Sequence, residues 1–147
     1  MLEVQDDLLW IGHAGDIRQP RLLFDVGIVA IVDLAYEEFV AELPRQLIYC
    51  RFPINDGGGN GPSVLRQAVQ CVVDLLASGT QTLVACSAGM SRSPTIAAFA
   101  LAAHLSQSPD HALDHILNRK PCDINRTLWN DVATIFSNVR HPTPRMD

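Results

Sequence analysis

The chemistry of this sequence is concentrated in residues 85–93, which read Ala-Cys-Ser-Ala-Gly-Met-Ser-Arg-Ser. Five residues separate Cys86 from Arg92, a glycine lies between them, and Ser93 follows the arginine directly. A thiolate is a strong nucleophile. A guanidinium is a planar fork that can hold two oxygens of one phosphoryl group. The segment therefore combines a nucleophile with a candidate oxyanion site.

The flanking segments predict how the thiol is positioned. The apolar run 81–85 before Cys86 is typical of a buried strand, and residues 93–105 after it are typical of a helix. In such a strand-loop-helix turn, the loop amides and the helix amino end point at one spot, which binds anions and favours thiolate over thiol. A nucleophile and a phosphate cradle in one short loop indicate a phosphatase.

The remainder of the chain predicts one α/β domain. Strands are expected at residues 8–12, 28–34, 46–54 and 81–85, and helices at 19–26, 62–78, 93–105, from 108 onward, and at 125–138. This alternation implies a mostly parallel central sheet with helices on both faces. The expected catalytic domain covers residues 1–140, followed by a loose tail over 141–147. Ligands of such sheets bind at the carboxyl ends of the strands, where Cys86 falls.

Composition and charge argue against several partners and cofactors. The net charge is −5 and no cluster of lysine and arginine occurs, so neither nucleic acid nor an anionic membrane surface is expected as a partner. No membrane-spanning run and no signal peptide is evident, so a cytoplasmic location is expected. His111 and His115 have a metal-like spacing but no evident third ligand. No metal and no other cofactor is therefore expected.

Residues 86–95, CSAGMSRSPT, resemble the signature of the dual-specificity phosphatases, a branch of the cysteine-based protein tyrosine phosphatases. The resemblance spans most of the chain, and its Cys/Gly/Arg/Ser core is highly specific. Outside that core the matches are individually weak; they cover residues 8–12, 27–34, 52–56, 112–119 and 124–125.

The resemblance implies a role for each residue of the loop. Cys86 would attack phosphorus in line and form a cysteinyl-phosphate intermediate. Ser93 would donate a hydrogen bond to the sulfur and make it a better leaving group, and its other interpretation, a plain helix N-cap, is expected to hold as well. Arg92 and the loop amides would bind the equatorial oxygens and stabilise the transition state. The expected phosphate-binding residues are Ser87, Ala88, Gly89, Met90, Ser91 and Arg92.

A general acid must protonate the departing oxygen and then activate water. Asp56 is the candidate, because it lies thirty residues before Cys86, as in the family, and three glycines follow it. Those glycines would let the loop move over a bound substrate. A structural turn aspartate is the alternative interpretation. Asp33 and Asp74 are poorer candidates, since one belongs to a different strand end and the other to a helix.

The sequence departs from the family at Ala85, where a histidine usually helps to ionise the thiol; an active but less ionised nucleophile is therefore expected. The uncharged loop side chains favour phosphoamino acids over polyphosphoinositides. The resemblance thus implies a metal-independent protein phosphatase acting on phosphotyrosine and phosphoserine or phosphothreonine. Three alternatives stay open: a phosphatase of a small non-protein phosphomonoester, a non-catalytic phosphate-binding module, and a thiol redox enzyme of the arsenate reductase kind.

Overall fold

The computed structural model describes residues 1–137, which contain five strands and six helices. The strands are β1 (Leu2–Gln5), β2 (Leu9–His13), β3 (Ala30–Ala35), β4 (Ile48–Ile54) and β5 (Thr82–Cys86). The helices are α1 (Ala14–Ile17), α2 (Pro20–Val26), α3 (Pro62–Ala77), α4 (Arg92–Leu105), α5 (Pro109–Leu117) and α6 (Arg126–Ser137). Each predicted strand and helix is present, with its ends displaced by no more than about two residues. Asn138 and the expected tail lie outside the described residues.

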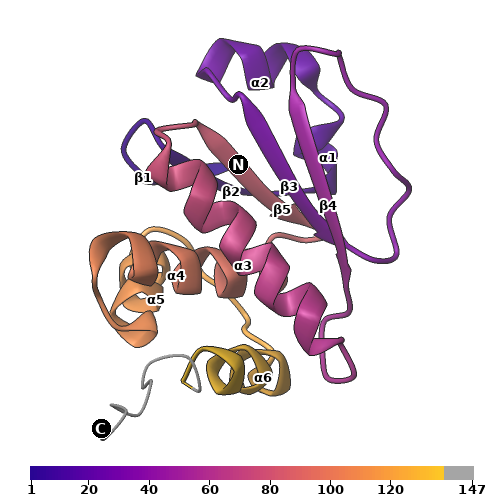
Figure 1. The fold of residues 1–147 in the computed structure, drawn as a ribbon. Helices are drawn as coiled ribbons and strands as arrows, with labels where there is room; N and C mark the ends of the chain where they lie inside the picture. The colour runs from indigo at the N-terminus through magenta and orange to yellow at the C-terminus, as the bar shows by residue number, and fades with distance from the viewer. Residues whose placement is uncertain (138–147) are drawn as a thin grey trace, which may run out of the picture.

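The five strands form one sheet in the order β1-β2-β5-β3-β4 (Figure 1). β2, β5, β3 and β4 run parallel to one another, and only β1 is antiparallel to its neighbour. The prediction of a mostly parallel sheet is therefore confirmed. Parallel strands bring their carboxyl ends to one edge of the sheet, and β5 delivers Cys86 to the middle of that edge.

β1 was not predicted from the sequence, and neither was the single turn of α1. β1 has four residues, and Val4 alone among them is fully buried, so the strand is too short to show an alternating pattern. The turn that follows contains Asp7 in the left-handed region, with φ 53°. Aspartate tolerates this backbone better than most residues, and the hairpin closes there.

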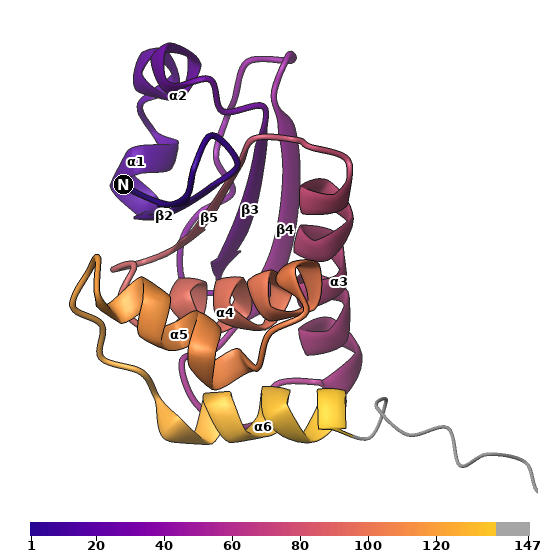
Figure 2. The ribbon, with the colours of Figure 1, turned by 90° about the vertical axis from the view of Figure 1, so that its left-hand side faces the viewer.

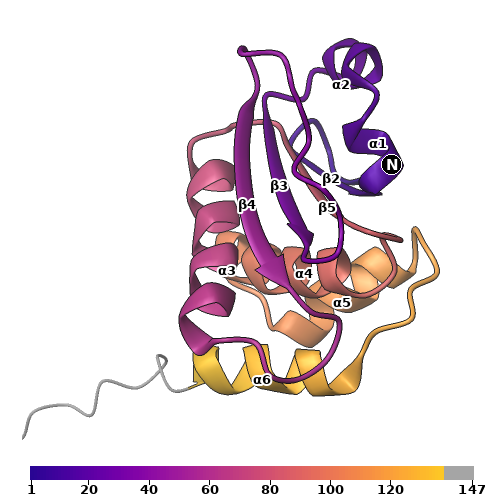
Figure 3. The same ribbon diagram turned by 90° about the vertical axis from the view of Figure 1, so that its right-hand side faces the viewer.

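Helices cover both faces of the sheet, as predicted. α1 and α2 lie on the opposite side of the sheet from α3 (Figures 2 and 3). Alternate residues of β5 divide between two buried clusters, because successive side chains of a strand point to opposite faces. Val84 and Cys86 belong to the buried cluster that includes residues of α3, α4, α5 and α6. Leu83 and Ala85 belong to the other cluster, on the side of α1 and α2.

The candidate loop lies between a strand and a helix that are both enclosed by the rest of the fold. All residues of β5 are buried, and so is every residue of α4 from Arg92 to Ala102. The many alanines of α4 let α3 and α5 pack closely against it. Two such buried elements leave the short loop between them little freedom to change its backbone.

α6 closes the same side of the molecule by packing aromatic side chains against α4. The ring of Phe99 in α4 lies 4.7 Å from that of Trp129 and 6.0 Å from that of Phe136, both in α6. This contact fixes α6, and with it the segment 118–125 that leads back past the candidate loop. Among residues 1–137, no helix combines the length and apolar character needed to cross a bilayer.

Candidate active site

The carbonyl groups of loop 87–91, between β5 and α4, accept hydrogen bonds from segments outside the loop. Three of these carbonyls accept hydrogen bonds from other segments: Ser87 O from Ala14 N (3.3 Å), Gly89 O from Lys120 Nζ (2.7 Å) and Met90 O from Asp123 N (2.9 Å). When the carbonyls of a short loop turn outward, its amides turn inward. The amide hydrogens therefore gather around the point where β5 ends.

The inward amides surround the sulfur of Cys86 and leave donors free beside it. The amides of Gly89 and Ser93 donate to Cys86 Sγ at 3.2 and 3.5 Å. Four loop amides have no acceptor within residues 1–137; they belong to Ser87, Ala88, Met90 and Ser91. Unpaired amides at the amino end of a helix form a binding site for an oxyanion.

Gly89 is required by the path of this loop. Its φ is +72°, in the left-handed region, and a Cβ there would lie 2.9 Å from the carbonyl oxygen of Gly12 and 2.9 Å from Lys120 Nζ. Any other residue would both strain the backbone and press against β2.

Ser93 is fully buried, and its hydroxyl lies 3.3 Å from Cys86 Sγ, the pair expected from the sequence. Its other interpretation, a helix N-cap, is wrong. α4 begins at Arg92, so Ser91 is the cap residue and Ser93 lies inside the first turn.

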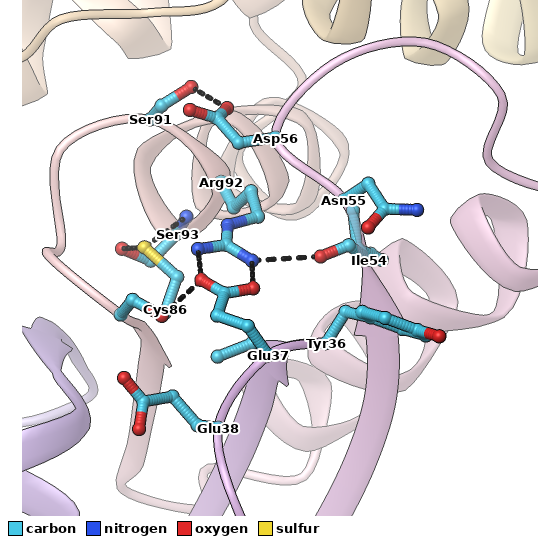
Figure 4. A network of polar contacts seen from close by, with 12 residues as sticks. Tyr36, Glu37, Glu38, Ile54, Asn55, Asp56, Cys86, Ser91, Arg92 and Ser93 are labelled. Carbon is cyan, nitrogen blue, oxygen red and sulfur yellow. Dashed lines mark hydrogen bonds and ion pairs between the residues drawn. The ribbon is translucent and has the colours of Figure 1, made fainter.

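Arg92 is buried, and its guanidinium is held by two groups from other strand ends (Figure 4). Its Nη1 donates to the carbonyl of Ile54 at 2.9 Å and to Glu37 Oε2 at 2.7 Å, and its Nη2 donates to Glu37 Oε1. Ser87 Oγ donates to the same carboxylate. This bidentate arrangement fixes the plane of the fork, while Arg92 Nε has no partner within residues 1–137.

The ion pair changes the titration of both partners. The hydrogen bond from Arg92, opposed by a smaller effect of burial, lowers the pKa of Glu37 from 4.5 to about 2. Burial acts to lower the pKa of Arg92, but the contacts with Glu37 and the charges of Cys86 and Asp56 outweigh it and raise that pKa. Both groups are therefore ionised at neutral pH.

Asp56 lies directly against the candidate loop, although β4 ends two residues before it. Ser91 Oγ donates to Asp56 Oδ1 at 2.6 Å, and Asn125 Nδ2 donates to the Asp56 carbonyl at 3.1 Å. Asn60 bridges the glycine-rich turn by bonding to Asn55 and Gly57. The loop that was expected to move over a substrate is already closed against Ser91 in this structure.

Most of the residues expected from the sequence line one small cavity. Its volume is about 180 Å³, and its lining residues are Asp56, Cys86, Ala88, Met90, Ser91, Arg92 and Asp123. Ser87, Gly89 and Ser93 do not line it. The hydroxyl of Ser87 donates to Glu37 instead. The amide of Gly89 and the hydroxyl of Ser93 form hydrogen bonds with the sulfur of Cys86 on the side away from the cavity lining.

The other aspartates considered from the sequence lie elsewhere. Asp33 is buried on β3, where it accepts hydrogen bonds from the Tyr49 hydroxyl at 2.5 Å and from a backbone amide. Asp74 is on α3 and accepts from Gln70 at 2.9 Å. Ala85, which replaces the family's usual histidine, is fully buried beside β3 and pairs in register with Asp33.

The spacing of His111 and His115 does not correspond to a ligand cluster. His115 Nε2 lies 2.7 Å from the carbonyl of Val4. Within residues 1–137, histidine, cysteine, aspartate and glutamate nowhere form a group of three that could hold a metal ion.

Sequence reasoning missed four residues that support the site: Glu37, Lys120, Asp123 and the amide side chain of Asn125. A signal for Glu37 existed, because it follows the carboxyl end of β3, at the same sheet edge as Cys86. Asn125 could have been found as a helix cap, since its Oδ1 accepts from Leu128 N at 3.1 Å. Lys120 had no comparable signal, because only the fold brings segment 118–125 to the loop.

No family model and no curated protein sequence matches this chain. Solved structures do match it. Human DUSP28 has a TM-score of 0.83 at 18% identity, over 95% of this chain and 98% of that one. A mouse putative dual specificity phosphatase complexed with zinc tungstate has a TM-score of 0.82 at 22% identity, over 94% and 87%. PTPMT1 has a TM-score of 0.71 at 20% identity, over 91% and 92%.

These similarities show that the chain has the fold of the dual-specificity phosphatases and, more broadly, of the cysteine-based protein tyrosine phosphatases. They confirm the resemblance and the α/β fold class inferred from the sequence. Because the identities are low, the similarity concerns the fold.

The geometry of the loop makes a prediction for Gly89→Ala. A left-handed alanine costs about 1–2 kcal/mol, and its Cβ would displace the backbone that carries the inward amides. We expect tungstate affinity, measured by calorimetry, to fall by about tenfold or more, which corresponds to the loss of one hydrogen bond between a loop amide and the anion.

Gly79→Ala is the matched control for this change. Gly79 has φ +70°, but nothing lies within 4 Å of a Cβ placed there. The Gly79→Ala protein should lose a free energy of unfolding, measured with urea, similar to that lost by Gly89→Ala, and should keep the tungstate affinity of the wild type. Unchanged tungstate binding by a folded Gly89→Ala protein would contradict the assigned geometry.

The low pKa of Glu37 makes stability depend on pH. Because this pKa falls from 4.5 to about 2 on folding, the ionised carboxylate stabilises the folded state above pH 4.5 and loses this effect as the pH falls toward 2. Glu37→Gln should therefore lower the Tm at pH 7, and the difference from wild type should narrow by pH 3.

Glu38→Gln serves as the control, since it removes the same charge from the same segment but leaves Arg92 paired. A Glu37→Gln effect of equal size at pH 7 and pH 3 would argue that the ion pair is not its source.

Proposed function

We propose that this protein is a cysteine-dependent phosphomonoester hydrolase of the dual-specificity type, acting on phosphotyrosine and on phosphoserine or phosphothreonine in proteins. The observation that carries the proposal is the meeting of Cys86, Arg92 and Asp56 at one cavity of about 180 Å³. These side chains supply a nucleophile, an oxyanion-binding fork and a carboxyl group, which phosphoryl transfer requires.

The first step transfers the phosphoryl group to the enzyme. The unpaired loop amides and Arg92 bind the non-bridging oxygens, which places phosphorus above the sulfur. Cys86 Sγ attacks phosphorus as the bond to the leaving oxygen breaks, and that oxygen takes a proton from the Asp56 carboxyl group. The products are a cysteinyl-phosphate and the free alcohol or phenol.

The second step hydrolyses the intermediate. The Asp56 carboxylate removes a proton from water, the water oxygen bonds to phosphorus, and the S–P bond breaks to release inorganic phosphate. Ser93 Oγ, 3.3 Å from Cys86 Sγ, stabilises the departing thiolate. The same donors that surround the sulfur in the resting site therefore assist its departure.

The size and lining of the cavity support a phosphoamino-acid substrate. Ala88 and Met90 line it without charge, and its volume is below the roughly 300 Å³ at which sites for larger ligands begin. Such a small pocket is suited to a phosphoryl group and little more. Short serine and threonine esters can therefore reach the sulfur as well as tyrosine esters.

A phosphoinositide headgroup is the second candidate substrate. One observation favours it: PTPMT1 has also been solved in complex with PI(5)P, and that structure matches this chain with a TM-score of 0.66 at 18% identity. Phosphate release from a panel of phosphopeptides and phosphoinositides, with and without EDTA, distinguishes the two. Activity that survives EDTA supports the metal-independent mechanism, and binding without turnover would indicate an interaction module.

The mechanism predicts that Cys86→Ser abolishes steady hydrolysis of p-nitrophenyl phosphate yet retains tungstate binding, because the cradle remains while the nucleophile is lost. Cys71→Ser is the control, since this half-buried thiol lies on α3, away from the cavity. It should keep wild-type activity. Turnover by Cys86→Ser near the wild-type rate would refute the covalent mechanism.

A second prediction concerns the general acid. Asp56→Asn should lower kcat by about 10²–10⁴ for phosphate esters with poor leaving groups, and by less for aryl esters whose leaving groups need little protonation. Asp74→Asn, on the exposed side of α3, should leave kcat unchanged. An equal loss for aryl and alkyl esters would place the acid elsewhere.

A further inference from the structure

Ser91 occupies the N-cap position of α4, but its hydroxyl does not cap the helix. A serine at this position commonly accepts a hydrogen bond from an amide of the first turn, which is worth about 1 kcal/mol. Here the side chain, 5% exposed, lies between two other segments. Its Oγ donates to Asp56 Oδ1 at 2.6 Å and accepts from the backbone amide of Asn125 at 2.9 Å (Figure 4 shows the first of these bonds).

The two bonds determine where the hydroxyl hydrogen points. A serine hydroxyl has one hydrogen and two lone pairs. The amide of Asn125 can only donate, so it takes a lone pair and leaves the hydrogen for Asp56 Oδ1. Within residues 1–137, Ser91 Oγ has no other partner that could accept this hydrogen.

The direction of that hydrogen determines which oxygen of protonated Asp56 carries its proton. The hydroxyl oxygen of a carboxylic acid is a weaker hydrogen-bond acceptor than its carbonyl oxygen, so a proton on Oδ1 would weaken the bond from the buried Ser91 hydroxyl. A proton on Oδ2 avoids this loss, and Oδ2 has no hydrogen-bond partner within residues 1–137.

We infer that Ser91 is a positioning residue for the general acid: its hydroxyl, aimed by the Asn125 amide, holds Asp56 Oδ1 and leaves the transferable proton on Oδ2. This inference rests on the proposed role of Asp56 as the acid. Oδ2–H is the bond that breaks when the leaving oxygen takes the proton, and water later returns a proton to the same oxygen.

Asn125 connects this arrangement to the rest of the fold. Its side-chain Nδ2 donates to the Asp56 carbonyl, while its Oδ1 accepts from Leu128 N at the start of α6. One residue therefore holds the acid loop, the phosphate loop and α6 in register. The acid is oriented before a substrate arrives, which removes an ordering cost from the chemical step.

The test compares Ser91→Ala with wild type on phosphate esters of increasing leaving-group basicity, from p-nitrophenyl through phenyl to alkyl phosphates. We expect kcat to fall by about ten- to a hundredfold for phenyl and alkyl esters, the range for a lost bond to a charged group. The loss should be small for p-nitrophenyl phosphate, and KM and tungstate affinity should stay unchanged.

A double-mutant cycle separates an effect through Asp56 from a structural one. In the Asp56→Asn background, Ser91→Ala should cause no further loss of kcat. Additive losses, an equal loss for every ester, or weaker tungstate binding would show that Ser91 only supports the loop, and would overturn the inference. If Asp56→Asn itself matches wild type on alkyl esters, the proposed acid is wrong, a result distinct from failure of the Ser91 role.

Asn125→Ser provides a second variant in case Ser91→Ala does not fold. Serine retains a good N-cap for α6 and the backbone amide that aims Ser91, but cannot reach the Asp56 carbonyl. It should show a smaller loss with the same dependence on the leaving group. A folded Asn125→Ser protein whose loss is uniform across the esters would contradict the arrangement.

Discussion

The structure of the site depends on the hydrogen bonds that hold the carbonyls of loop 87–91 pointing outward. A loop of this length can turn its amides inward only if something compensates the carbonyls on the other side. Ala14, Lys120 and the amide of Asp123 provide that compensation from three separate segments. The left-handed Gly89 makes the turn possible, because a side chain at that position would collide with β2.

The enclosed position of β5 and α4 makes this geometry rigid. Cys86 is only 2% exposed, so groups of the protein, and not bulk water, must provide the hydrogen bonds to its sulfur. Two backbone amides and the hydroxyl of Ser93 do so. In the proposed reaction the substrate meets a cradle whose donors are already oriented, which is the condition for electrostatic stabilisation of a transition state.

Two acidic segments from neighbouring strand ends complete the site with different roles. Glu37, after β3, is ionised and binds the fork of Arg92, which prevents a buried cation from lacking a partner. Asp56, after β4, keeps Oδ2 free beside the cavity. The two carboxylates have different partners: that of Glu37 is paired with a guanidinium, whereas that of Asp56 accepts from one neutral donor, the Ser91 hydroxyl.

The sequence alone determined every strand and helix except β1 and α1, the parallel sheet and the place of Cys86 at its edge, because these follow from apolar periodicity and local turn signals. It also indicated Arg92, Ser93 and Asp56 as candidates, through spacing within one loop and a resemblance. Only the tertiary structure decided which partners hold them. Glu37 and Lys120 reach the loop through contacts between residues far apart in the chain, and no local pattern encodes such a distance. The same holds for the hydroxyl of Ser91: the sequence assigned this residue only to the phosphate-binding loop, and the fold placed beside it the aspartate and the backbone amide that determine the direction of its hydrogen.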